Sequence, residues 1–75
     1  MTAKQLFDVF SDHQDDYEFS YKGKNGSVCI FSWSDISVAY DGESTDLKNL
    51  DEVMKVPFLA GKSFNDVAED IILYG

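Results

Sequence analysis

The 75-residue sequence lacks a second cysteine, because Cys29 is the only one. No disulfide can form within the chain, and a small domain without disulfides is typical of a reducing compartment. The sequence also lacks an apolar run long enough to span a membrane, and its first ten residues lack the apolar stretch of a signal peptide. We therefore expect a soluble, cytoplasmic protein.

Basic residues are also scarce, since six Lys and Arg stand against fourteen Asp and Glu, for a formal net charge of −8. Such a charge opposes binding to the phosphates of nucleic acids and to anionic membranes. It favours a basic partner, although small domains also carry net charge for solubility alone. The sequence therefore predicts neither nucleic-acid nor membrane binding.

Aromatic residues, in contrast, are abundant and make up 15% of the sequence. Burial of their large side chains supplies enough apolar area for one hydrophobic core. A chain of this length has no room for two cores, so residues 1–75 are expected to form a single domain.

The first segment, from Thr2 to about Ser11, is predicted to form a helix. Apolar residues recur there with the spacing of one buried helical face, at Ala3, Leu6, Phe7 and Phe10. Thr2 and Gln5 have the form of a capping box, in which two side chains satisfy backbone N–H groups at the start of a helix. Residues 11–16 are polar and are expected to be a connection.

Residues 17–22 alternate between apolar and polar, which predicts a strand, and Asn25-Gly26 is a strong hairpin signal. A two-residue loop at Asn25-Gly26 would place the aromatics of this strand on the opposite face from Phe31 and Trp33. A three-residue loop, residues 24–26, gathers all of these aromatics on one face. We choose the second register because a slip of one residue would scatter them.

A third strand, from Ile36 to Tyr40, completes the predicted three-stranded antiparallel meander. Its apolar face is expected to carry Tyr17, Phe19, Tyr21, Cys29, Phe31, Trp33, Ile36, Val38 and Tyr40. The other face is expected to carry Glu18, Ser20, Lys22, Val28, Ile30, Ser32, Ser37 and Ala39. An isolated sheet of this size needs its apolar face covered, and flanking helices are the available cover.

The remainder of the chain predicts a polar connection over residues 42–48 and two helices. Asn49 is expected to cap a short helix that ends before Pro57. The last helix is expected to run from about Phe64 to Leu73. The predicted fold class is α+β, a three-stranded antiparallel β-meander with helices packed on one face, in the order αβββαα.

The triplet Gly61-Lys62-Ser63 has the residues that end a phosphate-binding P-loop. The first glycine of that motif would fall at position 56, which is Val56, and Pro57 then removes a backbone amide that the loop needs. Ser63 is better explained as the cap of the last helix, with Asp66 completing a capping box. We therefore predict no nucleotide binding.

The acidic stretch from Asp41 to Glu52 places Asp41, Glu43, Thr45 and Glu52 at ligand positions of an EF-hand loop. Asp46, however, stands where that loop must have glycine for its sharp turn. Weak metal binding through residues 41–52 is therefore only a lesser alternative, and no cofactor is predicted.

The other candidate groups for chemistry also favour structural roles. His13 lies among aspartates in a predicted loop that offers no preorganised metal site, and Cys29 is expected to be inert on the buried face. Aromatics beside Lys22 and Lys24 could form a platform for single-stranded nucleic acid, but they are needed for the core and no basic groove accompanies them. No pairing of a nucleophile with a base is visible, so we expect a protein that is not an enzyme.

The acidic helix surfaces are the most informative feature of the sequence. The expected last helix carries Asp66, Glu69 and Asp70 on one face, and the first carries Asp8 and Asp12. Like charges at these spacings destabilise a helix, and Asp12 and Asp70 also lie near helix C-termini, where the dipole disfavours anions. Local conflicts of this kind are expected at functional surfaces.

The sequence therefore predicts a small acidic protein, of a bacterial or phage type, that binds a basic protein surface. Inhibitor, immunity-type and regulatory roles fit this description, and the expected binding residues are Asp8, Asp12, Asp66, Glu69 and Asp70. The main alternative is a structural or accessory protein that self-associates through Val28, Ile30 and Ala39 on the outer sheet face. The expected state is a monomer or a weak homodimer.

Overall fold

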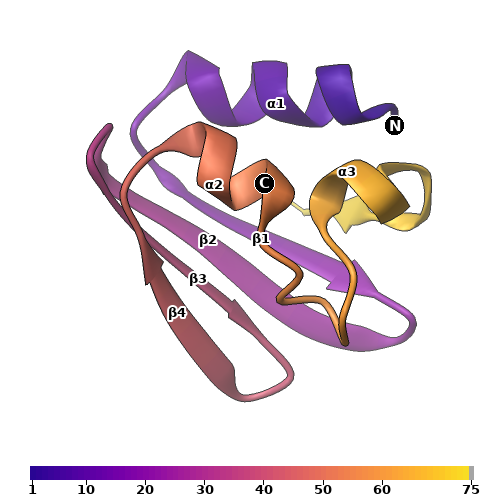
Figure 1. Ribbon diagram of the computed structural model, residues 1–75. Coiled ribbons are helices and arrows are strands. Elements are labelled where there is room, and N and C mark those ends of the chain that lie inside the picture. The colour runs from indigo at the N-terminus through magenta and orange to yellow at the C-terminus, as the bar shows by residue number, and fades with distance from the viewer. Residues whose placement is uncertain (75) are drawn as a thin grey trace.

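The computed structural model describes residues 1–74. Its elements, in chain order, are α1 (Ala3–Asp12), β1 (Asp16–Tyr21), β2 (Lys24–Ser32), β3 (Asp35–Tyr40), β4 (Glu43–Leu47), α2 (Leu50–Lys55), α3 (Phe64–Val67), the 3-10 helix η1 (Ala68–Asp70) and β5 (Ile72–Leu73). One antiparallel sheet has the strand order β4-β3-β2-β1-β5, and the helices lie together on one side of it (Figure 1). No helix within residues 1–74 has the length and apolar character needed to cross a membrane.

The predicted α+β class with an antiparallel sheet is confirmed, but the predicted strand count and order are wrong. The sheet has five strands instead of three, and the order is αββββααβ instead of αβββαα. The two added strands come from segments that were expected to be a polar connection and the end of a helix.

Helix α1 forms as its sequence predicts. The capping box is present, since the Thr2 side chain accepts from the backbone N–H of Gln5 and the Gln5 side chain accepts from that of Thr2. Leu6 and Phe10 are fully buried against the sheet and the other helices. The amphipathic pattern therefore decides both the position and the orientation of this helix.

The turn between β1 and β2 lies at Lys22-Gly23, so the predicted loop over residues 24–26 is wrong. Lys22 has φ = 52° and Gly23 has φ = 76°, and Tyr21 pairs with Lys24. Two successive residues with positive φ give a tight hairpin turn whose twist matches that of the strands. The Asn25-Gly26 pair is instead part of β2.

This register places a different set of side chains in the core. Val28 and Ile30, which were expected on the outer face, are buried. Phe31 and Trp33, which were expected in the core, are 65% and 44% exposed. Phe31 lies at a β-bulge, where β2 has one residue more than β3. Phe19 therefore faces the core and Phe31 does not, so the predicted grouping of the aromatics is wrong.

Strand β4 forms in the segment that was expected to be a polar connection. Asp41 and Gly42 have φ = 52° and 86°, which makes them a second tight hairpin turn, and Tyr40 pairs with Glu43 across it. An edge strand needs only one apolar face, and of its five residues only Leu47 is buried. The polar composition of residues 43–47 therefore gave no indication of the edge strand that they form.

The chain after Ser63 is helical only as far as Asp70, so the predicted helix to Leu73 is wrong. It forms one turn of α-helix and one turn of 3-10 helix, and then Ile72 and Leu73 pair with β1. A short helix with acidic residues near its C-terminal end is weakly stable by itself. The exposed edge of β1 offers unpaired backbone groups, and pairing with that edge competes successfully.

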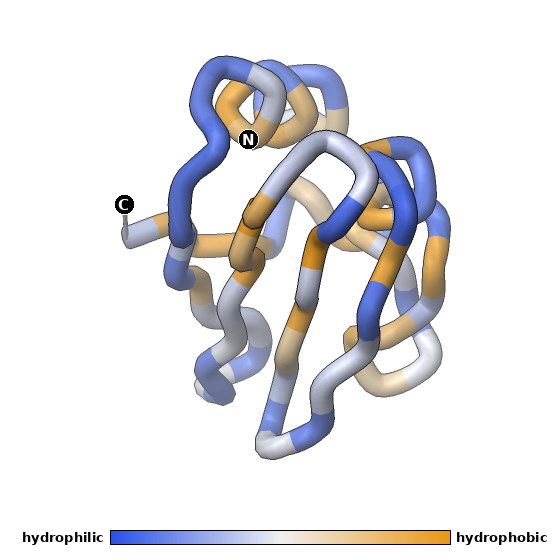
Figure 2. The backbone as a smooth tube through the Cα atoms, turned by 90° about the vertical axis from the view of Figure 1, so that its left-hand side faces the viewer, coloured by the Kyte–Doolittle hydropathy of each residue, from blue (hydrophilic) through white to orange (hydrophobic). Residues whose placement is uncertain are grey.

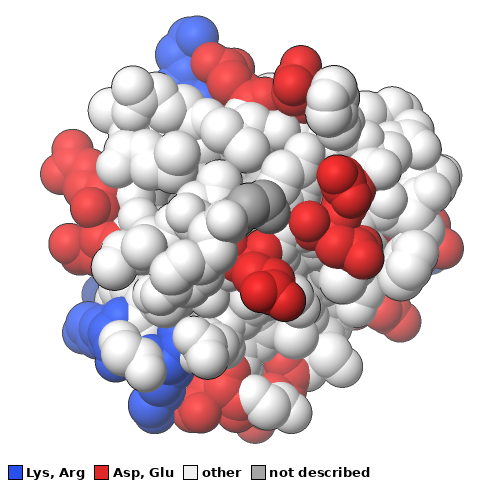
Figure 3. Space-filling view, turned by 180° about the vertical axis from the view of Figure 1, so that it is seen from behind, with Lys and Arg blue, Asp and Glu red and all other residues white. Residues whose placement is uncertain are grey.

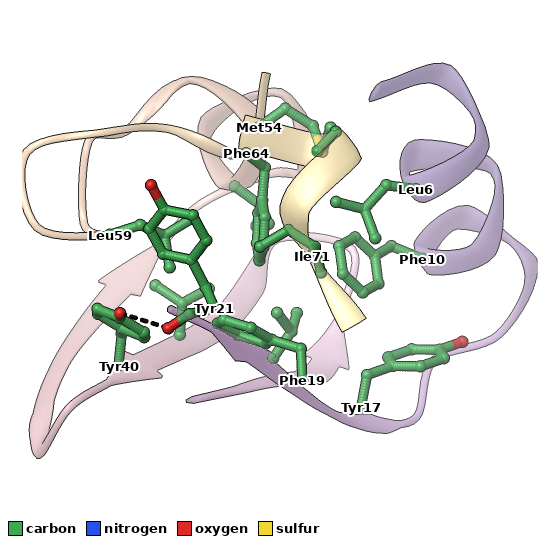
Figure 4. Close-up of a cluster of buried hydrophobic side chains, with 14 of the residues drawn as sticks. Leu6, Phe10, Tyr17, Phe19, Tyr21, Tyr40, Met54, Leu59, Phe64 and Ile71 are labelled. Atoms are coloured by element: carbon green, nitrogen blue, oxygen red, sulfur yellow. Dashed lines mark hydrogen bonds between the residues drawn. The ribbon is translucent and has the colours of Figure 1, made fainter. Parts of the chain in front are cut away.

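The core lies between the sheet and the helices (Figure 4). Phe10, Phe19 and Phe64 are fully buried, with ring centroids 5.6 Å apart for Phe10–Phe64 and 5.1 Å apart for Phe19–Phe64. The hydroxyl of Tyr40 donates to the backbone oxygen of Tyr21 at 2.8 Å. Apolar and polar residues alternate along the strands (Figure 2), so the opposite face of the sheet carries mainly polar side chains.

Candidate functional site

The acidic residues expected to bind a partner lie at separate places on the helices. Asp8 pairs with Lys4 at 3.3 Å, and Asp12 lies 3.7 Å from the single histidine. Asp66, Glu69 and Asp70 lie on α3 and η1, next to the beginning of α1 and away from its C-terminal end (Figure 1). The structure therefore brings three of the five residues together.

These three carboxylates have unequal roles. Asp66 accepts hydrogen bonds from the backbone N–H and the hydroxyl of Ser63, which lower its pKa, and it thereby completes the predicted capping box. Glu69 and Asp70 make no ion pair among the residues that the structure describes. They line an open hollow of about 320 Å³ beside Thr2 and Ala3. Asp66 is thus a structural cap, and the other two are free charges.

The phosphate-loop and metal alternatives find no matching geometry. Ala60 and Gly61 form a tight turn with φ = 56° and 85°, and the chain then enters α3 through the Ser63 cap. The acids of residues 41–52 are spread along β4 and α2, and the described residues contain no group of three or more potential metal ligands. Individual acids of this segment have structural contacts instead. Asp41, for example, forms an ion pair with Lys24 at 3.0 Å.

Cys29 lies on the face of the sheet that the helices leave open, and not in the predicted core. It is half-buried, and burial together with the carboxylate of Asp16 raises the pKa of its thiol. A raised pKa reduces the thiolate fraction and hence nucleophilic reactivity. The ring of His13 is exposed and lies beside Asp12, where the α1–β1 connection leaves α1.

The sheet face opposite the helices is not packed against a helix, and we call it the open face. Its side chains alternate with those of the core. They belong to Asp16, Glu18, Ser20, Asn25, Ser27, Cys29, Phe31, Ser37, Ala39, Ser44, Asp46 and, on β5, the exposed Ile72, which pairs with Ser20. Small side chains occupy the middle of this face, and carboxylates stand toward its sides.

Two rows of residues across the strands define the charge of the open face. The first row is Asp16, Cys29, Ser37 and Asp46, and the second is Glu18, Ser27, Ala39 and Ser44. Neither row contains a basic residue, and no ion pair is found for Asp16, Glu18 or Asp46 among residues 1–74. With strands about 4.8 Å apart, the two acids of the first row are separated by about 14 Å.

The second row borders an open hollow of about 570 Å³. Glu18, Ser27, Ala39 and Tyr74 are among its lining residues, and the Tyr74 hydroxyl donates to Ser20 at 3.0 Å. Figure 3 views this side of the molecule and shows carboxylates spread over its middle, whereas lysines appear only at the lower left and at the top. The open face is therefore concave in part and negatively charged.

Phe31 and Trp33 lie at the end of the open face where β2 turns into β3, and we call this region the aromatic end. Asp35 pairs with Ser32 in the same turn. The α1–β1 connection lies beside it, because the N–H of Ile30 donates to the backbone oxygen of Asp15. The exposed aromatics thus lie among aspartates.

The sequence reasoning missed Phe31 and Trp33 as surface residues. It assigned them to the core because the hairpin was placed at Asn25-Gly26. The signal that could have found them is Lys22-Gly23, which would set Val28 and Ile30 on the core face. Of the apolar patch expected for self-association, only Ala39 remains on the open face. Comparison of the chain with protein-family models, with curated proteins and with solved structures finds no match, so its function has to be argued from these surfaces.

Proposed function

We propose that this protein is a non-enzymatic binding module that docks a basic surface of another protein through the open face. The observation that carries the proposal is the charge of the two cross-strand rows, in which Asp16, Glu18 and Asp46 make no ion pair within residues 1–74. Carboxylates left without partners attract a basic surface and hasten the encounter with it.

The small side chains between these carboxylates support the same proposal. Ser27, Cys29, Ser37 and Ala39 are only partly buried and project little above the sheet. A partner can therefore approach the backbone of the middle strands closely while its basic groups reach the acids on either side. The raised pKa of Cys29 also argues against a nucleophilic role for the one thiol on this surface.

The helix-side acids Glu69 and Asp70 are the competing docking surface, because they too lack ion pairs among the described residues. They lie beside a smaller and more polar hollow, and none of the exposed aromatic residues within residues 1–74 lines it. Partner-binding surfaces typically combine aromatic anchors with charge. We therefore favour the open face over the helix-side acids as the docking surface.

Two charge-matched variants separate these surfaces. The open-face variant is D16N/E18Q/D46N, and the helix-side variant is D8N/E69Q/D70N. By neutralising three carboxylates, each takes the formal net charge from −8 to −5. Calorimetry at low salt with a short peptide of alternating lysine and glycine should give an affinity about tenfold lower for the open-face variant than for the wild type. The helix-side variant should bind nearly as the wild type does.

Amide shifts in NMR spectra locate the peptide independently of any substitution. Perturbed amides should concentrate at Ser27, Ser37 and Ala39. If they instead concentrate at Glu69 and Asp70, the docking surface is on the helix side. If the wild type shows no binding at low salt, a basic partner is the wrong class.

A further inference from the structure

Two aromatic side chains at the aromatic end are exposed although the chain has a core that is rich in aromatics. Phe31 lies at the β-bulge of β2 and directly follows the buried Ile30, so the alternation of the strand points its side chain away from the core. Trp33 follows in the turn and is close to half exposed. Exposed aromatic residues separated by a single residue, as Phe31 and Trp33 are, are typical anchors of binding surfaces.

Two aspartates lie near these rings in the sheet. Asp16 pairs directly with Cys29, which precedes Phe31 by two residues on the same face. Asp35 follows Trp33 directly after the turn. Diagonal neighbours on adjacent strands are about 7–8 Å apart, within reach of one long side chain.

The charges around the aromatic end are predominantly negative. Asp12 and Asp15 lie in or next to the adjoining connection. Lys48 follows β4 at the same end of the sheet, and the ring of His13 lies beside Asp12. Lys48 makes no ion pair within residues 1–74. A cation brought by a partner therefore meets an excess of carboxylates.

We propose that the aromatic end binds arginine side chains of the partner, in preference to lysine. A guanidinium group is planar, stacks on exposed aromatic faces, and presents several N–H donors in one plane. It can thus stack on Phe31 or Trp33 while it donates to Asp16 or Asp35. An ammonium group is a compact, strongly hydrated charge that neither stacks as a plane nor presents a forked set of donors, so it satisfies the ring and the carboxylate less well. This inference rests on the proposed function, because it names the partner chemistry at one end of the same open face.

Trp33 makes the aromatic end directly observable, since it is the only tryptophan in the chain. Its fluorescence can be followed while the protein is titrated with two peptides of equal length and charge. One alternates arginine with glycine, and the other alternates lysine with glycine. We expect the arginine peptide to change the Trp33 emission and to bind about three- to tenfold more tightly than the lysine peptide.

The variant F31A should lower the affinity of the arginine peptide about two- to fivefold and leave the lysine affinity unchanged. Because Phe31 is mostly exposed, this variant should unfold at the wild-type urea concentration. Y74F serves as a control at the far end of the open face. Equal affinities for the two peptides, with no effect of F31A, would overturn the arginine preference and leave the proposed basic partner in place. Absence of binding by either peptide would overturn both proposals.

Discussion

The ring of Phe19 lies over Gly26 on the neighbouring strand. These two residues are directly paired, and Tyr40 pairs with Gly26 from the other side. A Cβ atom at position 26 would overlap both the Phe19 ring, at Cζ and Cε1, and the backbone oxygen of Ala39, so the ring and the adjacent strand together occupy the space that a side chain would need. The rings of Phe19 and Tyr40 are nearly parallel, with centroids 6.2 Å apart. The glycine thus serves packing inside a strand and not a turn.

Substitution of Gly26 by alanine should therefore destabilise the protein by about 1–3 kcal/mol, because the new methyl group overpacks against Phe19 and the backbone oxygen of Ala39. Urea unfolding of G26A measures this loss. The double variant F19L/G26A separates the two contacts, since a smaller side chain at position 19 relieves only the first. The penalty of G26A should shrink in part in that background, and an unchanged penalty would assign the strain to the Ala39 backbone.

The hydroxyl of Tyr17 joins β1 to the end of α1. It donates to the backbone oxygens of Val9 and His13, at 3.2 and 3.1 Å. The variant Y17F should lose about 1 kcal/mol of stability, because these carbonyl groups lose a donor in a partly buried place. Y74F is the matched control. The hydroxyl of Tyr74 bonds only to Ser20 within residues 1–74, and the Tyr74 side chain is largely exposed. Equal losses of stability in Y17F and Y74F would show that the hydrogen bonds between Tyr17 and the end of α1 add no stability of their own.

Asp66 should make folding stability depend on acid pH. Hydrogen bonds from the backbone and the side chain of Ser63 lower its pKa in the folded state. A lowered folded pKa stabilises the fold fully above the pKa of the unfolded chain, about 4, and this contribution is lost as the pH falls through the folded value. Wild type should be more stable than D66N at neutral pH, with the difference narrowing below about pH 4. A constant difference across that range would contradict the assignment.

Alkylation of Cys29 reports on the open face. Burial, and then the nearby Asp16, raise the pKa of the thiol, so reaction with iodoacetamide near pH 8 should be slow. The variant D16N removes the repelling carboxylate and should react faster than the wild type. D51N, which removes a charge from exposed α2, should not change the rate. A ligand on the open face should slow the reaction of the wild type.

The parts of the fold that the sequence predicted depend on local signals. The capping boxes at Thr2 and Ser63, and the Asn49 cap with the helix end before Pro57, are settled by hydrogen bonds within a few residues. The α+β class follows from the periodicities. Each of these features needs only its own segment of chain.

The parts that failed depend on competition between segments. Asn25-Gly26 is a strong turn signal by itself, but Phe19 requires a glycine opposite its ring, and Lys22-Gly23 turns equally tightly. Strand β5 forms because the edge of β1 is available, which the sequence of Ile72 and Leu73 does not reveal. The open face inherits this failure, since a shift of the hairpin exchanges the two faces of β2. The aromatic end could be identified only once the register of the β1–β2 hairpin was known.

The hydrogen bond from the Tyr74 N–H to the Glu18 oxygen, at 2.8 Å, has a practical consequence for handling the protein. It fixes Tyr74 to the margin of the open face. A bulky label attached at position 74 would lie there and compete with a partner. A label attached at Lys4 would lie on α1, on the helix side (Figure 1). Capture experiments with the protein immobilised through position 74 should therefore miss partners that immobilisation through position 4 recovers.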